Sequence, residues 1–294
     1  MYYRRKIILS LLRQFDNSMS RLDFQKLLFL FSQNQKKTAY HFVPYKYGCY
    51  SFQANQDVLT LGKYGLIEEK EDKIYCKSNQ DYRSELSNED RLKLIQLHNS
   101  FSDFNTNELI MYVYRNYPYY AINSVIAGKI MNDDELLEIK RSKPDKSCPV
   151  IVSIGYEGRT IEEYTNVLLA NGIKVLFDVR KNAFSMKYGF SKKQLINVFE
   201  NIGISYIHVP ELGIDSNKRK KLNSPDDYRE LFHDYEINVL DNQIKQIDKL
   251  VRAYKKYRHI ALLCFEADPE YCHRTRILNR LLSHLDDKCE IVQR

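Results

Sequence analysis

The sequence predicts an open, Rossmann-like α/β domain with a mostly parallel sheet, preceded by a smaller, mainly helical domain. Apolar residues recur at helical spacing before residue 140, whereas continuous apolar runs alternate with helical patterns after residue 150. Continuous β-rich runs between helices are typical of a parallel sheet that is covered on both faces. A polar stretch with two prolines, residues 141–149, separates the two patterns and is typical of a linker.

We therefore divide the chain into a winged-helix-like domain at 1–140, a linker at 141–149 and a Rossmann-like domain at 150–294. No apolar run approaches the roughly 18 residues that span a bilayer, so we expect no membrane partner. Six scattered cysteines are too few for a disulfide framework and fit a cytoplasmic location. The net charge of +7 permits anionic partners but does not by itself indicate them.

The helical domain is predicted to contain three helices followed by a hairpin, with further helical segments at 108–114 and 121–130. Helical spacing runs from Ile7 to Phe15, and a capping sequence at Ser20 opens a second helix. A turn at 47–51 precedes the third helix, and residues 65–76 read strand, charged turn, strand. This is the order of a winged helix.

The segments 43–48, 51–52 and 61–67 resemble the winged-helix-like domains of the SocA and Panacea type. A winged helix suggests DNA binding, but the hairpin carries four acidic residues against two lysines, and acidic side chains repel phosphates. A protein partner is therefore favoured over DNA, and both remain open.

The second domain is predicted to alternate strands with helices. Strands are expected at 149–154, 174–179, 204–209 and 259–265, and helices at 161–170, 192–201, 240–256 and 274–285. In open parallel sheets, ligands bind outside the carboxyl ends of the strands, so the residues that follow each strand are the candidates for a site.

These strand ends are unusually polar. Asp178 and Arg180, two apart on one strand, point to the same side and suit a fixed contact with an anion, unless they form only an internal ion pair. We assign ligand binding to the following residues: Gly155, Tyr156, Glu157, Arg159, Asp178, Arg180, Glu211, Cys264, His273 and Arg274.

Three residues are candidates for catalysis. Cys272 is predicted in the first turn of the last helix, where free N–H groups and the helix dipole lower a thiol pKa. His208 and Glu266 are candidates for the general acid or base. The alternatives are a buried apolar cysteine and a structural histidine.

The pair Cys264 and Cys272 raises two further possibilities. Together with His273 they could supply three zinc ligands, but no C-x-x-C motif accompanies them and the signature of the zinc deaminases is missing. We therefore expect neither a metal nor a cofactor. A dithiol redox couple would require the two Cα atoms to lie within about 7 Å.

Five segments in order resemble the bacterial family called domain of unknown function 488, namely 154–164, 178–180, 190–195, 203–213 and 263–274. The resemblance spans residues 150–285. It implies a Rossmann-like fold in which both cysteines and the segments 178–180 and 272–274 are signature positions, and it implies no established reaction. Many relatives have an arginine where this chain has Lys187, and lysine lacks the bidentate geometry of arginine.

Two functional hypotheses follow. The first is an enzyme or recognition domain that acts on a phosphate-bearing ligand, a nucleotide or nucleic acid, with Arg180 and Arg274 as anion contacts. The second is a non-catalytic sensor, in which the α/β pocket binds a small anion and the N-terminal domain signals to DNA or to a protein partner. The sequence does not predict the oligomeric state.

Overall fold

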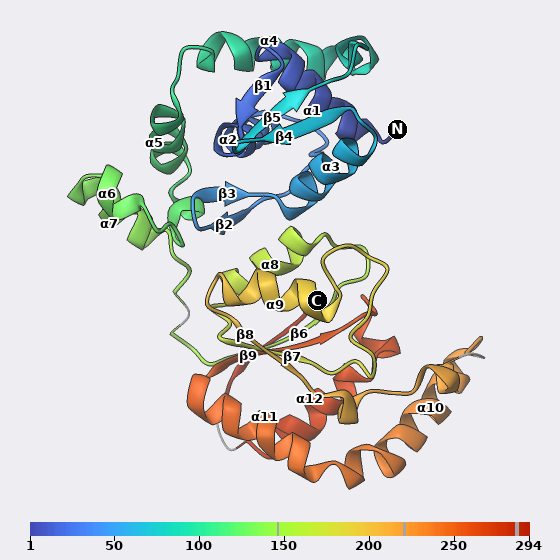
Figure 1. The fold of residues 1–294 in the computed structure, drawn as a ribbon. Helices are drawn as coiled ribbons and strands as arrows, with labels where there is room; N and C mark the ends of the chain where they lie inside the picture. The colour runs from blue at the N-terminus through green and yellow to red at the C-terminus, as the bar shows by residue number, and fades with distance from the viewer. Residues whose placement is uncertain (146, 220–221, 286–287) are drawn as a thin grey trace. The chain divides into compact units, whose positions relative to one another are not determined.

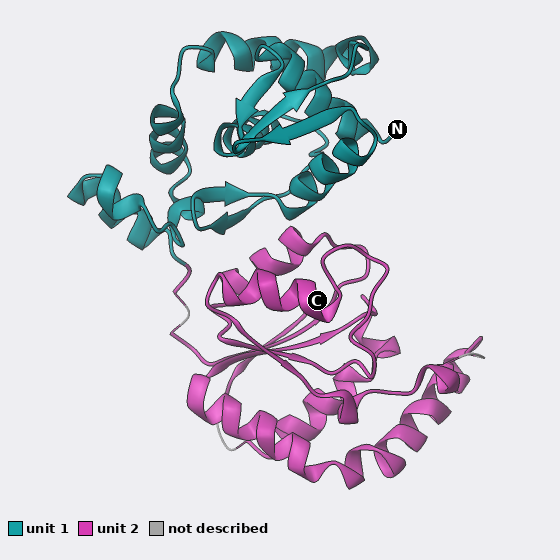
Figure 2. Cartoon of the chain, viewed as in Figure 1, with its two compact units in different colours: residues 1–143 teal, residues 144–294 magenta. Residues whose placement is uncertain are grey.

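The computed structural model describes residues 1–145, 147–219, 222–285 and 288–294. The chain separates into two compact units, Met1–Lys143 and Pro144–Arg294, shown in different colours in Figure 2. Across the described residues, no helix combines the length and the apolar character that a membrane span requires. Each unit is described by itself below.

The N-terminal unit contains the three predicted helices and the hairpin in the predicted order (Figure 1). The helices are α1 (Tyr3–Gln14), α2 (Arg21–Gln33) and α3 (Phe52–Lys63). An antiparallel sheet in the order β1-β5-β4 packs with them; its strands are β1 (Ser18–Ser20), β4 (Ile67–Lys70) and β5 (Lys73–Cys76).

Local sequence explains where α2 and α3 begin. The Ser20 hydroxyl accepts a hydrogen bond from the backbone N–H of Asp23 at 3.0 Å, and the Ser51 hydroxyl does the same for Ala54 at 3.2 Å. Such side-chain caps satisfy N–H groups that have no partner within the helix. The apolar faces of the helices then build one buried core, which includes Ile8, Leu28 and Leu61.

The remainder of this unit contains a second hairpin that the sequence did not indicate and, as predicted, helical residues within 108–114 and 121–130. Segment 47–51, predicted as a turn, belongs largely to a second hairpin, β2 (Val43–Tyr45) with β3 (Gly48–Tyr50). Further helices are α4 (Asn88–Phe101), α5 (Thr106–Asn116), α6 (Ala127–Ile130) and α7 (Asp133–Arg141), with 3₁₀ turns at Tyr82–Glu85 and Pro118–Ala121.

The C-terminal unit is built on a five-stranded, fully parallel sheet in the order β10-β6-β9-β7-β8, which confirms the predicted fold class. The strands are β6 (Val150–Gly155), β7 (Val175–Asp178), β8 (Ser205–His208), β9 (His259–Cys264) and β10 (Glu290–Gln293). Only β10 was not expected. It is an edge strand with polar ends, so it lacks the apolar run that marks the central strands.

Helices cover both faces of this sheet, with α8 and α9 on one face and α11 and α12 on the other (Figure 1). The helices are α8 (Ile161–Ala170), α9 (Lys192–Glu200), α10 (Pro225–Asn238), α11 (Ile244–Tyr257) and α12 (Arg274–Leu282). The helix predicted at 240–256 begins later, at Ile244, and α10 was not predicted. Short 3₁₀ turns at Pro210–Leu212, Ser216–Arg219 and Pro269–Tyr271 connect these elements.

Candidate functional site

A cluster of two thiols, a carboxylate and an imidazole lies at the carboxyl end of β9. Cys264 is the last residue of β9, Glu266 follows it, and Cys272 and His273 lie just before α12. One side-chain donor atom from each residue lies within 4.8 Å of all the others. The sequence predicted that these residues converge, and the chain reversal between β9 and α12 brings them together.

Short distances connect the members of this cluster. Glu266 Oε2 lies 3.0 Å from the sulfur of Cys264 and 3.0 Å from that of Cys272. The Nδ1 atom of His273 lies 3.6 Å from the Cys264 sulfur and 4.0 Å from the Cys272 sulfur. Both cysteines and the histidine are buried.

The imidazole of His273 is oriented by backbone. Its Nε2 lies 3.0 Å from the carbonyl oxygen of Val179, at the end of β7. A carbonyl only accepts hydrogen bonds, so Nε2 carries a proton; when the ring is neutral, the lone pair of Nδ1 faces the sulfurs.

Arg219 brings a positive charge to the cluster. Its guanidinium pairs with Glu266, and Nη2 lies 2.9 Å from Nδ1 of His273. Arg219 belongs to the basic run 218–221, of which residues 220 and 221 lie outside the described residues. Its buried Nε atom has no hydrogen-bond partner among the described residues.

The titration of the cluster is shared among its members. Burial alone raises the pKa of Cys264, but the hydrogen bond from Cys272 and the charge of His273 outweigh it and hold that pKa well below its ordinary value. Burial and the neighbouring Cys264 thiolate raise the pKa of Cys272 and also that of Glu266. Burial, the largest cause, lowers the pKa of His273, but the charge of the Cys264 thiolate and the hydrogen bonds to Cys264 and to the Val179 carbonyl together outweigh it, so the net shift is upward.

Asp178 and Arg180 form a buried ion pair beside the cluster. The guanidinium binds both carboxylate oxygens of Asp178, at 2.8 and 2.6 Å. Its remaining nitrogen, Nη1, donates to the Tyr156 hydroxyl and to the Phe190 carbonyl at 3.1 and 3.0 Å. Tyr206 donates to the same carboxylate at 2.6 Å. Most donors of Arg180 are therefore already used within the protein.

Arg274 and Gly155 hold the loop that contains Glu266. Arg274 is fully buried and donates to the backbone carbonyls of Glu266, Ala267 and Arg294. A Cβ atom at position 155 would lie 1.8 Å from the Glu266 carbonyl oxygen, so only glycine allows this approach. Both residues support the site through the backbone.

The other predicted site residues lie farther from the thiols. Nε2 of His208 lies 2.9 Å from the Arg180 carbonyl oxygen. Glu157 accepts a hydrogen bond from the backbone of Ala267 at 2.9 Å, which joins the loops after β6 and β9. Glu211 is exposed on a 3₁₀ turn, and Arg159 is half-buried at the start of α8.

A pocket of about 340 Å³ opens over the cluster. Cys264 and His273 line it, as do Tyr156 and Arg180, whereas Cys272 is completely buried and does not. Arg219 also lines the pocket, and residues outside the predicted site complete the lining: Lys181, Asn182, Phe184, Ile214, Ser216 and Phe265. Lys181 and Asn182 directly follow the Asp-Val-Arg segment, and this proximity was the available signal.

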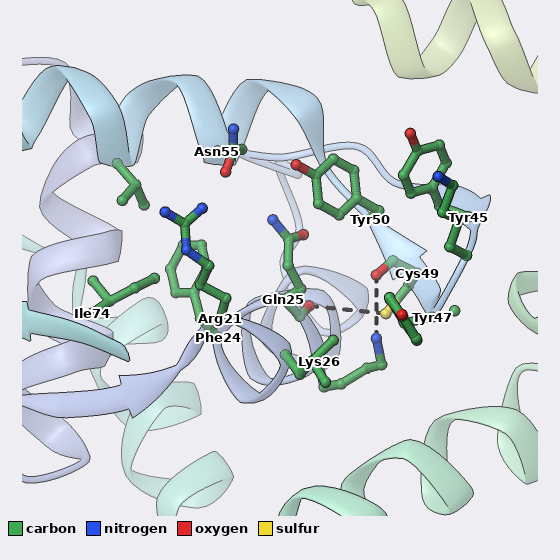
Figure 3. A pocket seen from close by; sticks show the side chains of 14 residues that line it. Arg21, Phe24, Gln25, Lys26, Tyr45, Tyr47, Cys49, Tyr50, Asn55 and Ile74 are labelled. Atoms are coloured by element: carbon green, nitrogen blue, oxygen red, sulfur yellow. Dashed lines mark hydrogen bonds between the residues drawn. The ribbon is translucent and has the colours of Figure 1, made fainter. Parts of the chain in front are cut away.

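The N-terminal unit has a separate pocket of about 240 Å³ (Figure 3). Its walls are largely aromatic and aliphatic, with Phe24, Tyr45 and Tyr50 among them. Lys26 lies at this pocket but is only 1% exposed, and its ammonium donates to the Cys49 carbonyl at 3.5 Å. Burial lowers the pKa of Lys26.

One comparison with known proteins bears on the second unit. Residues 160–281 match the family model described as Domain of unknown function DUF488, the family that the five sequence segments resemble. No curated protein matches the chain.

Proposed function

We propose that the C-terminal unit is an enzyme that acts on a phosphate-bearing ligand, a nucleotide or nucleic acid, in the pocket over Cys264. The single observation that carries this proposal is the composition of the pocket, which places cations, exposed aromatic rings and a thiol–imidazole cluster together. A volume of about 340 Å³ lies within the range of small-molecule sites, roughly 300–1,000 Å³.

Two cations are suited to hold a phosphate. Lys181 forms no ion pair among the described residues, and Arg219 also lines the pocket with a side chain that is 28% exposed. Asn182 and Ser216 add neutral hydrogen-bonding groups to the same lining. Arg180 and Arg274, the anion contacts expected from the sequence, are largely engaged with internal partners and so act mainly as supports.

Aromatic side chains favour a base-bearing ligand. Phe184 is 71% exposed and Phe265 is 44% exposed, and both line the pocket. Stacking of a base on an aromatic ring contributes about 1–3 kcal/mol, and combined with cations it is typical of nucleotide and single-strand sites.

The reactive centre of the proposed enzyme is the cluster at the pocket floor. Cys264 and His273 line the pocket, so a bound phosphate group would contact a sulfur and an imidazole. The Glu266 carboxylate contacts both sulfurs and can accept or donate a proton there. Cys272, the nucleophile expected from the sequence, is completely buried, and its thiol donates to the Glu266 carboxylate that also contacts Cys264.

The test uses the full chain and defined probes. The four ribonucleoside 5′-monophosphates and a short single-stranded RNA are offered in a binding titration. Lys181→Ala should weaken binding about tenfold or more, because a hydrogen bond to a charged group contributes roughly 1.5–3 kcal/mol. Lys193→Ala, an exposed lysine on α9, is the matched control and should bind as the wild type. Absence of binding by every probe would refute the proposal.

Turnover separates the enzyme from the sensor. Phosphorus NMR of the incubated complex should show a new phosphate species if the unit is an enzyme. If the bound probe is recovered unchanged after prolonged incubation, the sensor hypothesis replaces it.

For the N-terminal unit we propose a winged-helix module that contacts a protein. The order of α1, α2, α3 and the β4–β5 hairpin supports this proposal, as does the acidic hairpin. The observation that favours protein over DNA is that Glu68, Glu71 and Asp72 are exposed on that hairpin. A gel shift of random duplex DNA at low salt by micromolar protein would overturn it.

A further inference from the structure

The donor set of the cluster is that of a zinc site. Thiolate, imidazole and carboxylate are the three protein ligand types that Zn²⁺ takes, usually four in a tetrahedron. Four such donors, from Cys264, Glu266, Cys272 and His273, lie within 4.8 Å of one another. We propose that these four residues bind one zinc ion. This inference rests on the proposed function for its pocket and adds a metal ion to the cluster beside that pocket.

Four of the distances between donor atoms are near those of a tetrahedral site. With Zn–S near 2.3 Å and Zn–N near 2.0–2.1 Å, tetrahedral sulfur and nitrogen ligands lie about 3.5 Å apart. The Nδ1 of His273 lies 3.6 and 4.0 Å from the two sulfurs, and Glu266 Oε2 lies 3.0 Å from each. These four distances lie within about 0.6 Å of the tetrahedral spacing, and no pair of donors is farther apart than 4.8 Å, so side-chain rotations have to draw the donors together around the ion.

The support around the donors is also that of a metal site. Histidines that bind metals usually donate their other ring N–H to a carbonyl or carboxylate, which fixes the tautomer. His273 does this with the Val179 carbonyl at 3.0 Å, leaving Nδ1 for the metal. Arg274 donates to the Glu266 carbonyl, and Gly155 lets β6 approach it, so the residue that carries the carboxylate is held from two sides.

Arg219 competes with the metal. Its guanidinium occupies Nδ1 of His273 and the Glu266 carboxylate, the two ligands that do not contain sulfur. The side chain is 28% exposed, so it has room to withdraw into the pocket when the ion binds. There it would face the phosphate group of a ligand in the pocket, while the four protein ligands leave the zinc no open position for a phosphate oxygen.

The first experiment measures metal content. The full chain, purified without chelator, should contain about one zinc per chain by elemental analysis. Cys264→Ser and Cys272→Ser should each reduce zinc about tenfold or more. Cys148→Ser changes an exposed cysteine and is the matched control, so it should keep the zinc. Zinc retained by both cluster variants would overturn the proposal.

The second experiment requires no variant and so does not depend on variant folding. The wild-type chain is stripped and titrated with Co²⁺ alone. Sulfur ligation should produce thiolate-to-cobalt charge-transfer absorption that saturates at about one equivalent and disappears on addition of Zn²⁺. A wild-type chain with neither zinc nor this absorption would overturn the proposal.

Arg219→Gln separates this inference from the proposed function. Removing the competing guanidinium should tighten zinc binding several-fold and weaken binding of the nucleotide probes. An unchanged or weaker zinc affinity would contradict the idea that Arg219 and the zinc ion compete for Nδ1 of His273. Zinc binding without any nucleotide binding would support the metal site and refute the proposed function. Nucleotide binding without any zinc binding would support the proposed function and refute the metal site.

Discussion

Each unit of this protein buries a cation, and the two are held very differently. In the N-terminal unit, Lys26 has one backbone carbonyl at 3.5 Å, and no carboxylate of the described residues forms an ion pair with it. In the C-terminal unit, Arg180 has a bidentate carboxylate, a hydroxyl and a carbonyl. Burying a charge without a partner is costly, whereas a fully bonded pair fixes geometry. The difference indicates that Arg180 organises its surroundings, while Lys26 is kept at a cost in stability.

The largest expected effect comes from removing the partner of Arg180. Asp178→Ala leaves the guanidinium buried without its carboxylate and should destabilise the C-terminal unit by about 3–5 kcal/mol. Hydrogen exchange of β7 peptides measures this locally. Asp226→Ala breaks an exposed pair with Arg229 and should change stability by no more than about 0.5 kcal/mol. Equal effects of the two substitutions would mean that Arg180 does not organise the strand ends.

A smaller effect is expected at Gly155. Gly155→Ala forces the Glu266 carbonyl away, because the new Cβ would lie 1.8 Å from it, and should destabilise the unit by about 1–3 kcal/mol. Thermal melting of the full chain measures this. Gly128→Ala adds a Cβ in α6 with no atom within 4 Å and should be neutral or slightly stabilising. A melting temperature for Gly155→Ala that equals the wild type would contradict the close approach.

The smallest expected effect has the opposite sign. Lys26→Met removes the unpaired buried charge and should stabilise the N-terminal unit by about 1 kcal/mol, whereas exposed Lys63→Met should have little effect. Denaturant titration measures both. A loss of stability in Lys26→Met would show that the ammonium is better compensated than its contacts indicate.

The gain from Lys26→Met should depend on pH. The folded-state pKa of Lys26 is lowered, by burial first, with partial compensation from Cys49 and Asp23. Below that folded pKa the burial penalty is fully present. As the pH rises from there towards 10.5, the unfolded chain binds more protons, so the wild type gains stability and the difference from the variant shrinks. A difference that grows with pH would contradict the lowered pKa.

The sequence predicted the parts of the fold that periodicity controls. The four apolar strands and the order of the first helices follow from residue spacing, and polar strand ends in a parallel sheet must converge. Edge strand β10 was missed because its apolar content is low, and α10 because Leu231, Phe232 and Tyr235 make only a narrow apolar stripe.

The sequence could not predict which polar side chains are already hydrogen-bonded to backbone carbonyls. Arg274 looked like an anion contact, yet three carbonyls occupy it, and carbonyl positions leave no signature in residue types. The same limit applies to His208, which contacts the Arg180 carbonyl. Whether Cys264 or Cys272 reaches the pocket likewise depends on the path of the loop between β9 and α12.

The carbonyl of Val179 affects how the results of a mutational scan of this site are interpreted. The Val179 side chain is buried in the core, so a mutational scan would score the position on apolar volume alone. The group that orients His273 is the main-chain oxygen, which every substitution preserves. Substitutions at position 179 therefore do not report on the group that orients the imidazole. A direct spectroscopic probe of the ring, such as the nitrogen-15 chemical shifts of His273, would detect its tautomer.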